Sequence, residues 1–279
     1  MTLIDGRAIS AAILRDVTED VARLRAAGTT PTLAIVVPTD DEATAWYVRS
    51  IVRSATKVGI EARQIDLHGT TAVELVTELA ALSADPAVHG IICQTPLPKG
   101  VTLDQVGQHI APAKDVDGAN PESLGRLAAG LPAFAPATAQ AVVEILKREQ
   151  VPLEGADVVV VGRSNVVGKP AALLLLAENA TVTICHSRTR DLAAHTRHGD
   201  VLVAAVGRAR MLGADHVKPG AVVIDVGTNP TEDGGLVGDV DTAAVEPVAA
   251  AVTPVPGGVG PVTTALLLRN VTAATHSLA

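Results

Sequence analysis

The chain has 279 residues, 48% of them hydrophobic and only 1% aromatic, and a formal net charge of −8 at pH 7. This length suits two domains with large aliphatic cores. The acidic charge and the lack of a Lys/Arg cluster along any predicted helix argue against nucleic-acid binding. The aliphatic stretch Leu173–Leu176 is too short to cross a bilayer, and Met1–Ser10 has no signal-peptide pattern. Two isolated cysteines, Cys93 and Cys185, fit a reducing compartment, so we expect a cytoplasmic protein.

The first part of the chain alternates between helical and strand patterns. The predicted elements are, in order, a helix at 8–27, a strand at 31–37, a helix within 40–57, a strand at 61–67, a helix at 71–82 and a strand at 90–93. This alternation indicates an open α/β sheet, in which ligands bind beyond the carboxyl ends of the strands. Gln94 directly follows the strand at 90–93 and is therefore a candidate site residue.

A Gly/Pro-rich stretch, roughly 117–137, separates this half from a second α/β half. The second half has predicted strands at 158–161, 181–185, 201–206 and 221–226, and helices at 171–177 and 263–277. The last two strands are followed by Gly207 and Gly227, which we assign to a cofactor site. Glycine and proline dominate the loop at 254–261, whose backbone can therefore approach a ligand closely.

The stretch 157–189 reads as strand, glycine turn, helix and strand. Gly162 and Gly168 bracket the turn, with Ser164 between them, and we expect Pro170 at the first helical position. A turn that leads from a strand into a helix N-terminus binds phosphate through backbone N–H groups and the helix dipole. The spacing departs from G-x-G-x-x-G, so the turn alone is a weak signal.

The residues that follow the predicted strand 181–185 indicate which dinucleotide the site prefers. An NAD site usually places a carboxylate there for the ribose 2′-hydroxyl. Here the chain reads His186-Ser187-Arg188-Thr189, with no carboxylate before Asp191. Arg188, together with Arg163 in the glycine turn, suits a 2′-phosphate, so the pattern favours NADP over NAD. The alternative is that these basic residues form only a solvated loop tip.

Other chemistries find no support. Gly162–Val166 is not a G-x-S-x-G nucleophile elbow, and the histidines and cysteines form no zinc motif, so no metal is expected. Counting from Asp115 as a calcium loop gives Asn120 and Arg126 where Gly and Glu are needed. From this pattern alone, Asp117 is equally well an ordinary turn aspartate.

Several segments together resemble one family, the methylenetetrahydrofolate dehydrogenase/methenyltetrahydrofolate cyclohydrolases. The matching segments are Tyr47-Val48, Gln94-x-Pro96-Leu97-Pro98, Lys114–Gly118, Asn120-Pro121, Gly125–Leu127, Val161–Ser164 through Gly168–Pro170, His186–Thr189 and Thr253–Pro261. The resemblance implies two α/β domains that flank a cleft, the second a Rossmann-like NADP-binding domain. It places the folate-binding catalytic domain at 1–120 plus 264–279 and the NADP-binding domain at 121–263. It also implies a homodimer.

The resemblance also implies roles for individual residues. The expected catalytic residues are Tyr47, which contacts the folate, Gln94, which supports the family's catalytic lysine, and Asp117, which hydrogen-bonds the pterin ring. Pro256, Gly257, Gly258 and Val259 are expected to line the folate site. Arg163, Ser187 and Arg188 are expected to hold the 2′-phosphate of NADP.

The chain departs from the family at the lysine itself. The family carries this lysine four residues after the tyrosine, where this chain has Ile51. Arg49 and Arg53, two residues to either side, point elsewhere on a helix. Thr95, Ala119 and the segment Ala137–Ala141 also differ from the family pattern, whereas the cofactor half matches it.

The implied activity is NADP-dependent oxidation of 5,10-methylenetetrahydrofolate to 5,10-methenyltetrahydrofolate in one-carbon metabolism. We expect the second family activity, hydrolysis to 10-formyltetrahydrofolate, to be weak or lost. One alternative is an NADP oxidoreductase acting on a modified folate or pterin. The other is a non-enzymatic regulatory paralogue, against which the retained Tyr47, Gln94 and Asp117 argue.

Overall fold

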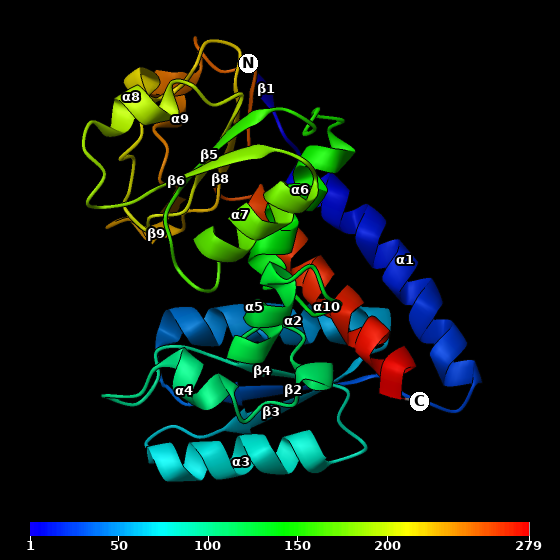
Figure 1. Ribbon diagram of the computed structural model, residues 1–279. Helices are drawn as coiled ribbons and strands as arrows, with labels where there is room; N and C mark the ends of the chain where they lie inside the picture. The colour runs from blue at the N-terminus through cyan, green and yellow to red at the C-terminus, as the bar shows by residue number, and fades with distance from the viewer. Residues whose placement is uncertain (279) are drawn as a thin grey trace. The chain divides into compact units, whose positions relative to one another are not determined.

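The computed structural model describes residues 1–278, which form two compact α/β units (Figure 1). Met1–Ser10 and Thr138–Thr263 make up the six-stranded unit. Ala11–Ala137 and the C-terminal residues from Thr264 make up the three-stranded unit. Among the described residues, no helix combines the length and apolar character that crossing a membrane requires.

The three-stranded unit contains a parallel sheet in the order β3-β2-β4. Its strands are β2 (Thr32–Val37), β3 (Glu61–Asp66) and β4 (Gly90–Cys93). Its helical segments are most of α1 (Gly6–Ala26), α2 (Glu42–Val58), α3 (Ala72–Ala84), α4 (Leu103–Gly107), η1 (Pro112–Lys114), α5 (Pro121–Ala128) and most of α10 (Val259–Leu278). Every residue of β2 is buried, since the strand is central and α2 and α3 lie on opposite faces of the sheet (Figure 1).

The six-stranded unit contains a parallel sheet in the order β1-β11-β8-β7-β5-β6. Its strands are β1 (Thr2–Leu3), β5 (Asp157–Val161), β6 (Thr181–Cys185), β7 (Val201–Ala204), β8 (Val222–Asp225) and β11 (Ala251–Val252). Its helical segments are α6 (Ala137–Arg148), α7 (Gly168–Ala177), α8 (Leu192–Thr196), η2 (Ala214–His216) and α9 (Thr242–Val245). The strands β9 (Asn229–Pro230) and β10 (Leu236–Val237) form a separate antiparallel pair.

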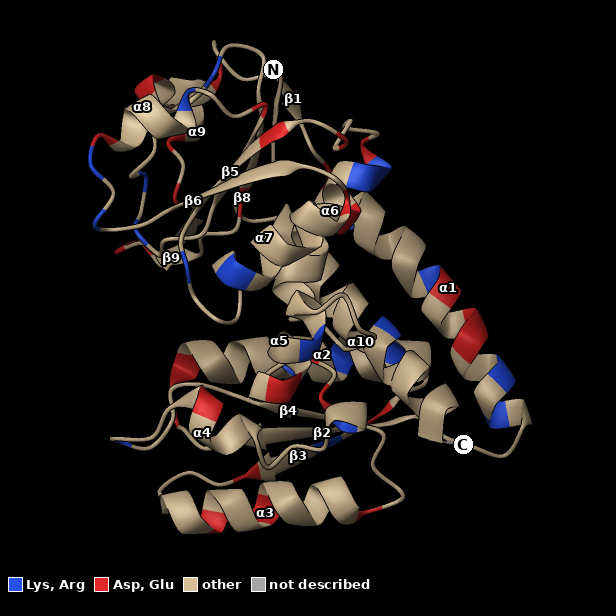
Figure 2. Ribbon diagram, viewed as in Figure 1, with Lys and Arg blue, Asp and Glu red and all other residues tan. Residues whose placement is uncertain are grey.

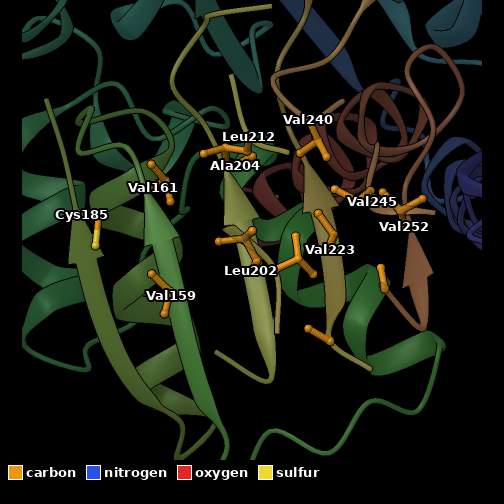
Figure 3. Packing of buried hydrophobic residues seen from close by; sticks show 13 residues of the cluster. Val159, Val161, Cys185, Leu202, Ala204, Leu212, Val223, Val240, Val245 and Val252 are labelled. Carbon is orange, nitrogen blue, oxygen red and sulfur yellow. The ribbon is translucent and has the colours of Figure 1, made fainter. Parts of the chain in front are cut away.

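One face of the six-stranded sheet carries a continuous aliphatic layer (Figure 3). Alternate residues of neighbouring strands point to this face, because side chains along a strand alternate between its two sides. The layer includes Val159, Leu202 and Val223 from three adjacent strands, and Val245 of α9 packs against them. The carboxyl ends of these buried parallel strands all lie at one edge of the sheet, where ligands of α/β proteins bind.

The compact units differ from the expected division at 120/121 in two places. Met1–Ser10 joins the six-stranded unit, because β1 pairs with β11. Residues 121–137 join the three-stranded unit. The carboxylate of Asp115 bonds the N–H of Asn120 at 2.9 Å, and that of Asp117 bonds the N–H of Ala137 at 3.1 Å, which ties both ends of this stretch to the unit.

Two helices start earlier than expected. α7 begins at Gly168, so Pro170 is its third residue and not its first, and α10 begins at Val259 and not at 263. Pro261 is likewise the third residue of α10. Proline is tolerated there because the first four N–H groups of a helix have no partner within the helix.

The sequence patterns did not predict α4, α5, α6, α8 or α9. α5 lies inside the Gly/Pro-rich stretch, where Asn120 caps it by accepting from the N–H of Glu122 at 2.8 Å. α6 buries an alanine-rich face that includes Ala137, Ala141 and Ile145. The strands expected at 201–206 and 221–226 are shorter, ending at Ala204 and Asp225. The residues after these two ends belong to loops held by side chains.

Candidate functional site

In the three-stranded unit, the start of α2 is tied to the segment that follows β4. Asp41 caps α2 by accepting from the N–H of Thr44 at 2.8 Å. The Thr44 hydroxyl donates to the carbonyl of Thr95 at 2.8 Å. The N–H of Gln94 donates to the carbonyl of Val36 at 2.9 Å, which extends the sheet pairing by one residue beyond β4. The half-buried side chains of Tyr47 and Gln94 are therefore carried by two segments joined at the carboxyl edge of the sheet.

Tyr47 lies on α2 near the carboxylate of Asp117, so the structure brings these two expected site residues together. Burial raises the pKa of the Tyr47 phenol well above its usual value, and the Asp117 charge raises it further. The Thr264 side chain partly opposes this shift of the pKa through a hydrogen bond. Tyr47 consequently remains a neutral phenol at physiological pH, able to donate a hydrogen bond.

Ile51 lies one helical turn after Tyr47 and is fully buried. It belongs to the buried stripe of α2 together with Val48, Ala55 and Val58. Arg49 and Arg53 are exposed, as expected from their spacing around the helix. The position that carries a lysine in the resembled family is thus filled by hydrocarbon, and neither neighbouring arginine replaces it within the buried stripe.

The two aspartates of the segment 115–118 have different surroundings. Asp115 is fully buried and accepts from the N–H groups of Ala119 and Asn120 at 2.8 and 2.9 Å and from the Ser123 hydroxyl at 2.6 Å. These contacts fold the chain from the turn into α5. Asp115 is therefore the residue that organises this turn.

Asp117 is half-buried and accepts from the N–H of Ala137 at 3.1 Å, twenty residues along the chain. Burial raises the pKa of its carboxyl from 3.8 to about 6, the Ala137 hydrogen bond lowers it, and the Asp115 charge raises it. A carboxylate with one backbone contact keeps acceptor capacity for a ligand. The arrangement favours the ligand-binding interpretation of Asp117 over that of a turn aspartate.

In the six-stranded unit, the glycine turn joins β5 to α7. Gly162 has φ 128°, and an added Cβ would clash with the carbonyl of Ala205. A Cβ on Gly168 would clash with the carbonyl of Gly162. The Ser164 hydroxyl accepts from the N–H groups of Val167 and Gly168 at 3.1 and 3.4 Å, so Ser164 caps the start of α7. The exposed Arg163 lies in the same turn.

The tip that follows β6 is a tight turn with exposed residues. The N–H of His186 donates to the Thr189 hydroxyl at 2.9 Å, and the N–H of Arg188 donates to His186 Nδ1 at 3.1 Å. Ser187 and Arg188 are exposed on this turn, and Figure 2 shows Lys and Arg on the loops around β6 and β9. The next carboxylate, Asp191, caps α8 by accepting from the N–H of Ala194 at 3.1 Å. The turn thus presents a cation and a hydroxyl, which suit a 2′-phosphate.

Gly207 and Gly227, the other two glycines expected at the cofactor site, have different surroundings. Gly207 has φ 65° and open space around it, whereas a Cβ on Gly227 would clash with the carboxylate of Asp239. Neither Asp239 nor its neighbour Asp225 was expected as a functional residue from the sequence. The one available signal was the aspartate that ends the apolar strand 222–225, and nothing in the sequence linked it to residue 239.

The segment Pro256–Val259, expected to line the folate site, lies in the six-stranded unit. Gly257 has φ 108°, and a Cβ on Gly258 would crowd Thr253. The backbone of Gly258 in turn packs against Gly6, where a Cβ would clash with it. These close approaches require glycine and give the loop one shape.

Within residues 1–278, no three His, Cys, Asp or Glu side chains are grouped so as to hold a metal ion. Both cysteines are free thiols, with Cys185 buried and Cys93 half-buried. Burial raises the pKa of the Cys93 thiol to about 12, so it is a poor nucleophile. The chemistry of the site therefore falls on the phenol, the carboxylate and the groups of the glycine turn.

Comparison with protein families gives two matches that together cover most of the chain. Residues 4–117 match the tetrahydrofolate dehydrogenase/cyclohydrolase catalytic domain, and residues 136–278 match the NAD(P)-binding domain of the same family. A protein from Parafrankia sp. named bifunctional protein FolD is 65% identical over 270 residues, covering 97% of this chain and 98% of the relative.

Solved structures of the family have the same fold. The bifunctional FolD methylenetetrahydrofolate dehydrogenase/cyclohydrolase from Campylobacter jejuni matches with a TM-score of 0.96 and 40% identity, covering 99% of each chain. The FolD enzyme from Trypanosoma brucei, solved with NADP cofactor and inhibitor, matches with a TM-score of 0.93 and 38% identity, covering 99% of this chain and 98% of that one.

Proposed function

Because this chain belongs to the tetrahydrofolate dehydrogenase/cyclohydrolase family, we propose that it works chiefly as the dehydrogenase of that pair of activities. It oxidises 5,10-methylenetetrahydrofolate to 5,10-methenyltetrahydrofolate with NADP as cofactor. The proposed restriction to the first step rests on one observation, the fully buried Ile51 at the position of the family's lysine.

The fit of NADP is supported by the groups at the carboxyl edge of the six-stranded sheet. The glycine turn is shaped for close approach of backbone, since side chains on Gly162 or Gly168 would clash. Arg163, Ser187 and Arg188 are exposed beside it and would hold the 2′-phosphate. The bound nicotinamide would accept the hydride from the one-carbon bridge of the folate. The protein would contribute binding and alignment.

Folate binding would rest on Asp117, Tyr47 and Gln94 in the three-stranded unit. The Asp117 carboxylate would accept from the amino-pyrimidine edge of the pterin, and the neutral Tyr47 phenol would donate to the substrate. These assignments are supported by the proximity of Tyr47 to Asp117 and by the acceptor capacity that Asp117 retains.

The cyclohydrolase step needs a group that moves protons while water attacks the methenyl carbon. A lysine does this when burial lowers its pKa towards neutrality. Ile51 has no proton to transfer, so the cyclohydrolase rate should fall by about 10²–10⁴-fold, the usual worth of general acid–base catalysis. Hydride transfer depends mainly on alignment and should persist.

The test measures both activities on the purified chain. We expect NADP-dependent oxidation of methylenetetrahydrofolate with accumulation of methenyltetrahydrofolate. Cyclohydrolase turnover equal to dehydrogenase turnover would overturn the restriction and show that another group moves the proton. Oxidation of a modified folate or pterin alone, or NADP binding without turnover, would instead support one of the two alternatives named above.

We also propose a homodimer that works in the cytoplasm. β6 is the last strand of its sheet, and its residue Ile184 is 42% exposed, while Leu176 on the adjoining α7 is 60% exposed. An edge strand with apolar neighbours is a surface that a second copy can cover. Sedimentation of the wild-type chain beside Ile184→Lys tests this: we expect a dimer that the substitution weakens, and a wild-type monomer at micromolar concentration would contradict it.

A further inference from the structure

The loop after β7 is held by a buried carboxylate from a distant part of the chain. Asp239 is fully buried, and its Oδ2 accepts from the N–H groups of Val206 and Gly207 at 2.6 and 3.0 Å. Its Oδ1 accepts from the N–H of Arg208 at 2.8 Å and from the side-chain amide of Asn229 at 3.0 Å. Three consecutive backbone donors thus converge on one side chain, which defines the course of the loop.

Asp239 is itself fixed by Asp225, the last residue of β8. Asp225 Oδ1 accepts from the N–H groups of Gly227 and Asp239 at 2.9 and 3.0 Å, and its Oδ2 accepts from the N–H of Val240 at 2.9 Å. Burial raises the pKa of Asp225 to about 6, and the Asp239 charge contributes to this rise. The two carboxylates therefore connect the loops that follow β7 and β8 through seven hydrogen bonds.

The strand order shows what these two loops face. Neighbouring strands run β8-β7-β5-β6, with the glycine turn after β5 and the Ser187-Arg188 tip after β6. A dinucleotide with its pyrophosphate at the glycine turn and its 2′-phosphate at the β6 tip must extend its other half in the opposite direction. That direction leads over the ends of β7 and β8, where Asp239 and Asp225 organise the backbone.

We propose that Asp239 is a positioning residue for the nicotinamide half of NADP, acting through the loop Val206–Arg208 and resting on the proposed function above. Because its carboxylate occupies the three N–H groups of that loop, they are unavailable to a phosphate. The pyrophosphate is thereby directed to the glycine turn, and the Val206–Arg208 loop is held in one shape beside the nicotinamide ribose.

The substitution Asp239→Asn tests this role. An amide keeps one acceptor oxygen but turns an NH₂ group towards backbone N–H donors, so part of the loop loses its partner. Calorimetric titration of the full chain should show NADP binding weakened about tenfold. Binding of 2′,5′-ADP, which contains only the adenine half of the cofactor, should change by less than about twofold. In kinetics, the KM for NADP should rise while the KM for methylenetetrahydrofolate stays constant.

Asp241→Asn is the matched control. Asp241 lies two residues after Asp239 and caps α9 by accepting from the N–H of Ala244 at 3.2 Å. It should leave both affinities unchanged. If Asp239→Asn does not fold, Asn229→Ala, which removes one donor to Asp239, replaces it and should weaken NADP binding by about twofold to threefold with 2′,5′-ADP unaffected.

The outcomes separate this inference from the proposed function. Equal weakening of NADP and 2′,5′-ADP would show a general structural role and overturn the inference, as would unchanged NADP binding. A wild-type chain that binds neither compound would instead contradict the assignment of the cofactor site itself.

Discussion

The two units place their functional groups on different kinds of support. In the six-stranded unit, the proposed cofactor site is made largely of backbone. Its glycines Gly162 and Gly168 have neighbours that leave no room for a Cβ, and buried carboxylates hold its loops. In the three-stranded unit, the proposed folate site is made of individual side chains on well-packed elements, such as Tyr47 on α2. A side chain of the three-stranded unit can therefore change without altering the fold. This explains how Ile51 can replace the family's lysine in α2 while the helix is retained.

The largest expected effect comes from breaking the backbone support. Gly162→Ala places a Cβ against the carbonyl of Ala205 at φ 128°, where side chains are rarely tolerated. We expect a loss of about 2–4 kcal/mol in the free energy of unfolding and loss of NADP binding. Urea denaturation and calorimetric titration measure the two effects.

Gly125→Ala is the matched control for this change, since Gly125 lies in helix α5 with open space around it. It should leave NADP binding unchanged and stabilise the chain by up to about 1 kcal/mol. Equal stability of the Gly162→Ala variant and the wild type would contradict the contrast between the units.

A pair of substitutions in the three-stranded unit separates binding from folding. Asp117→Ala should lower folate affinity by at least about 100-fold with a small effect on stability, because it removes a ligand contact and one backbone hydrogen bond. Asp115→Ala should lower the free energy of unfolding by about 3 kcal/mol or more, because three donors, two of them buried, lose their acceptor. Thermal melts beside folate titrations distinguish the two, and lost stability with normal affinity in Asp117→Ala would identify it as a turn residue.

The side-chain character of the folate site predicts a gain of activity at position 51. Ile51→Lys should raise the cyclohydrolase rate by about 10²-fold or more, with a smaller effect on hydride transfer. Some stability should be lost, because an amine enters a fully buried position. Ile51→Met, an apolar change of similar size, is the control and should leave the cyclohydrolase rate unaltered. A lysine variant with no gain would show that other changes in this unit limit the step.

Removing one cation from the cofactor site should alter cofactor choice without affecting the fold. Arg163→Ala should weaken NADP binding by about 10–100-fold and NAD binding far less, because only NADP carries the extra phosphate. Lys169→Ala is a suitable comparison, because it also removes one cation near the glycine turn. The Lys169 ammonium, on helix α7, already donates to Asn165 Oδ1 at 2.7 Å. Equal catalytic efficiency of the wild-type chain with NADP and NAD would contradict the assignment.

The smallest expected effect is a pH dependence of the KM for methylenetetrahydrofolate. The pKa of Asp117 is raised from 3.8 to about 6, and protonation would turn one carboxyl oxygen from an acceptor into a donor and so weaken its bond to the pterin edge. The KM for methylenetetrahydrofolate should therefore rise severalfold as the pH falls through about 6, and Asp117→Asn should flatten this profile.

The same raised pKa has an opposite consequence for stability. Between about pH 4 and 6 the folded chain binds more protons than the unfolded chain at Asp117, and also at Asp225, whose pKa is likewise about 6. The free energy of unfolding should then decrease as the pH rises through this window. Denaturation midpoints for the wild type and Asp117→Asn would show it, and identical pH dependence in both would exclude a contribution from Asp117.

By itself, the sequence determined the α/β class, the parallel strands, the glycine turn and the family, because hydrophobic periodicity and short motifs are local properties of the chain. The local pattern did not indicate α6, whose alanine-rich face follows several prolines, and it indicated the first helical position for Pro170, which is the third residue of α7. It also left the roles of Asp115 and Asp117 open, since both lie in one turn-forming segment.

Only the tertiary structure distinguished Asp115 from Asp117, because the partner of Asp117 is a neighbour in space that the sequence does not reveal. Asp117 accepts from the N–H of Ala137, and in the other unit Asp239 likewise accepts from the N–H of Val206, 33 residues away. Hydrogen bonds between distant segments depend on how the elements pack, and no local pattern encodes them. The folded chain, and not the local sequence, therefore decides that one proposed site is made of backbone groups and the other of side chains.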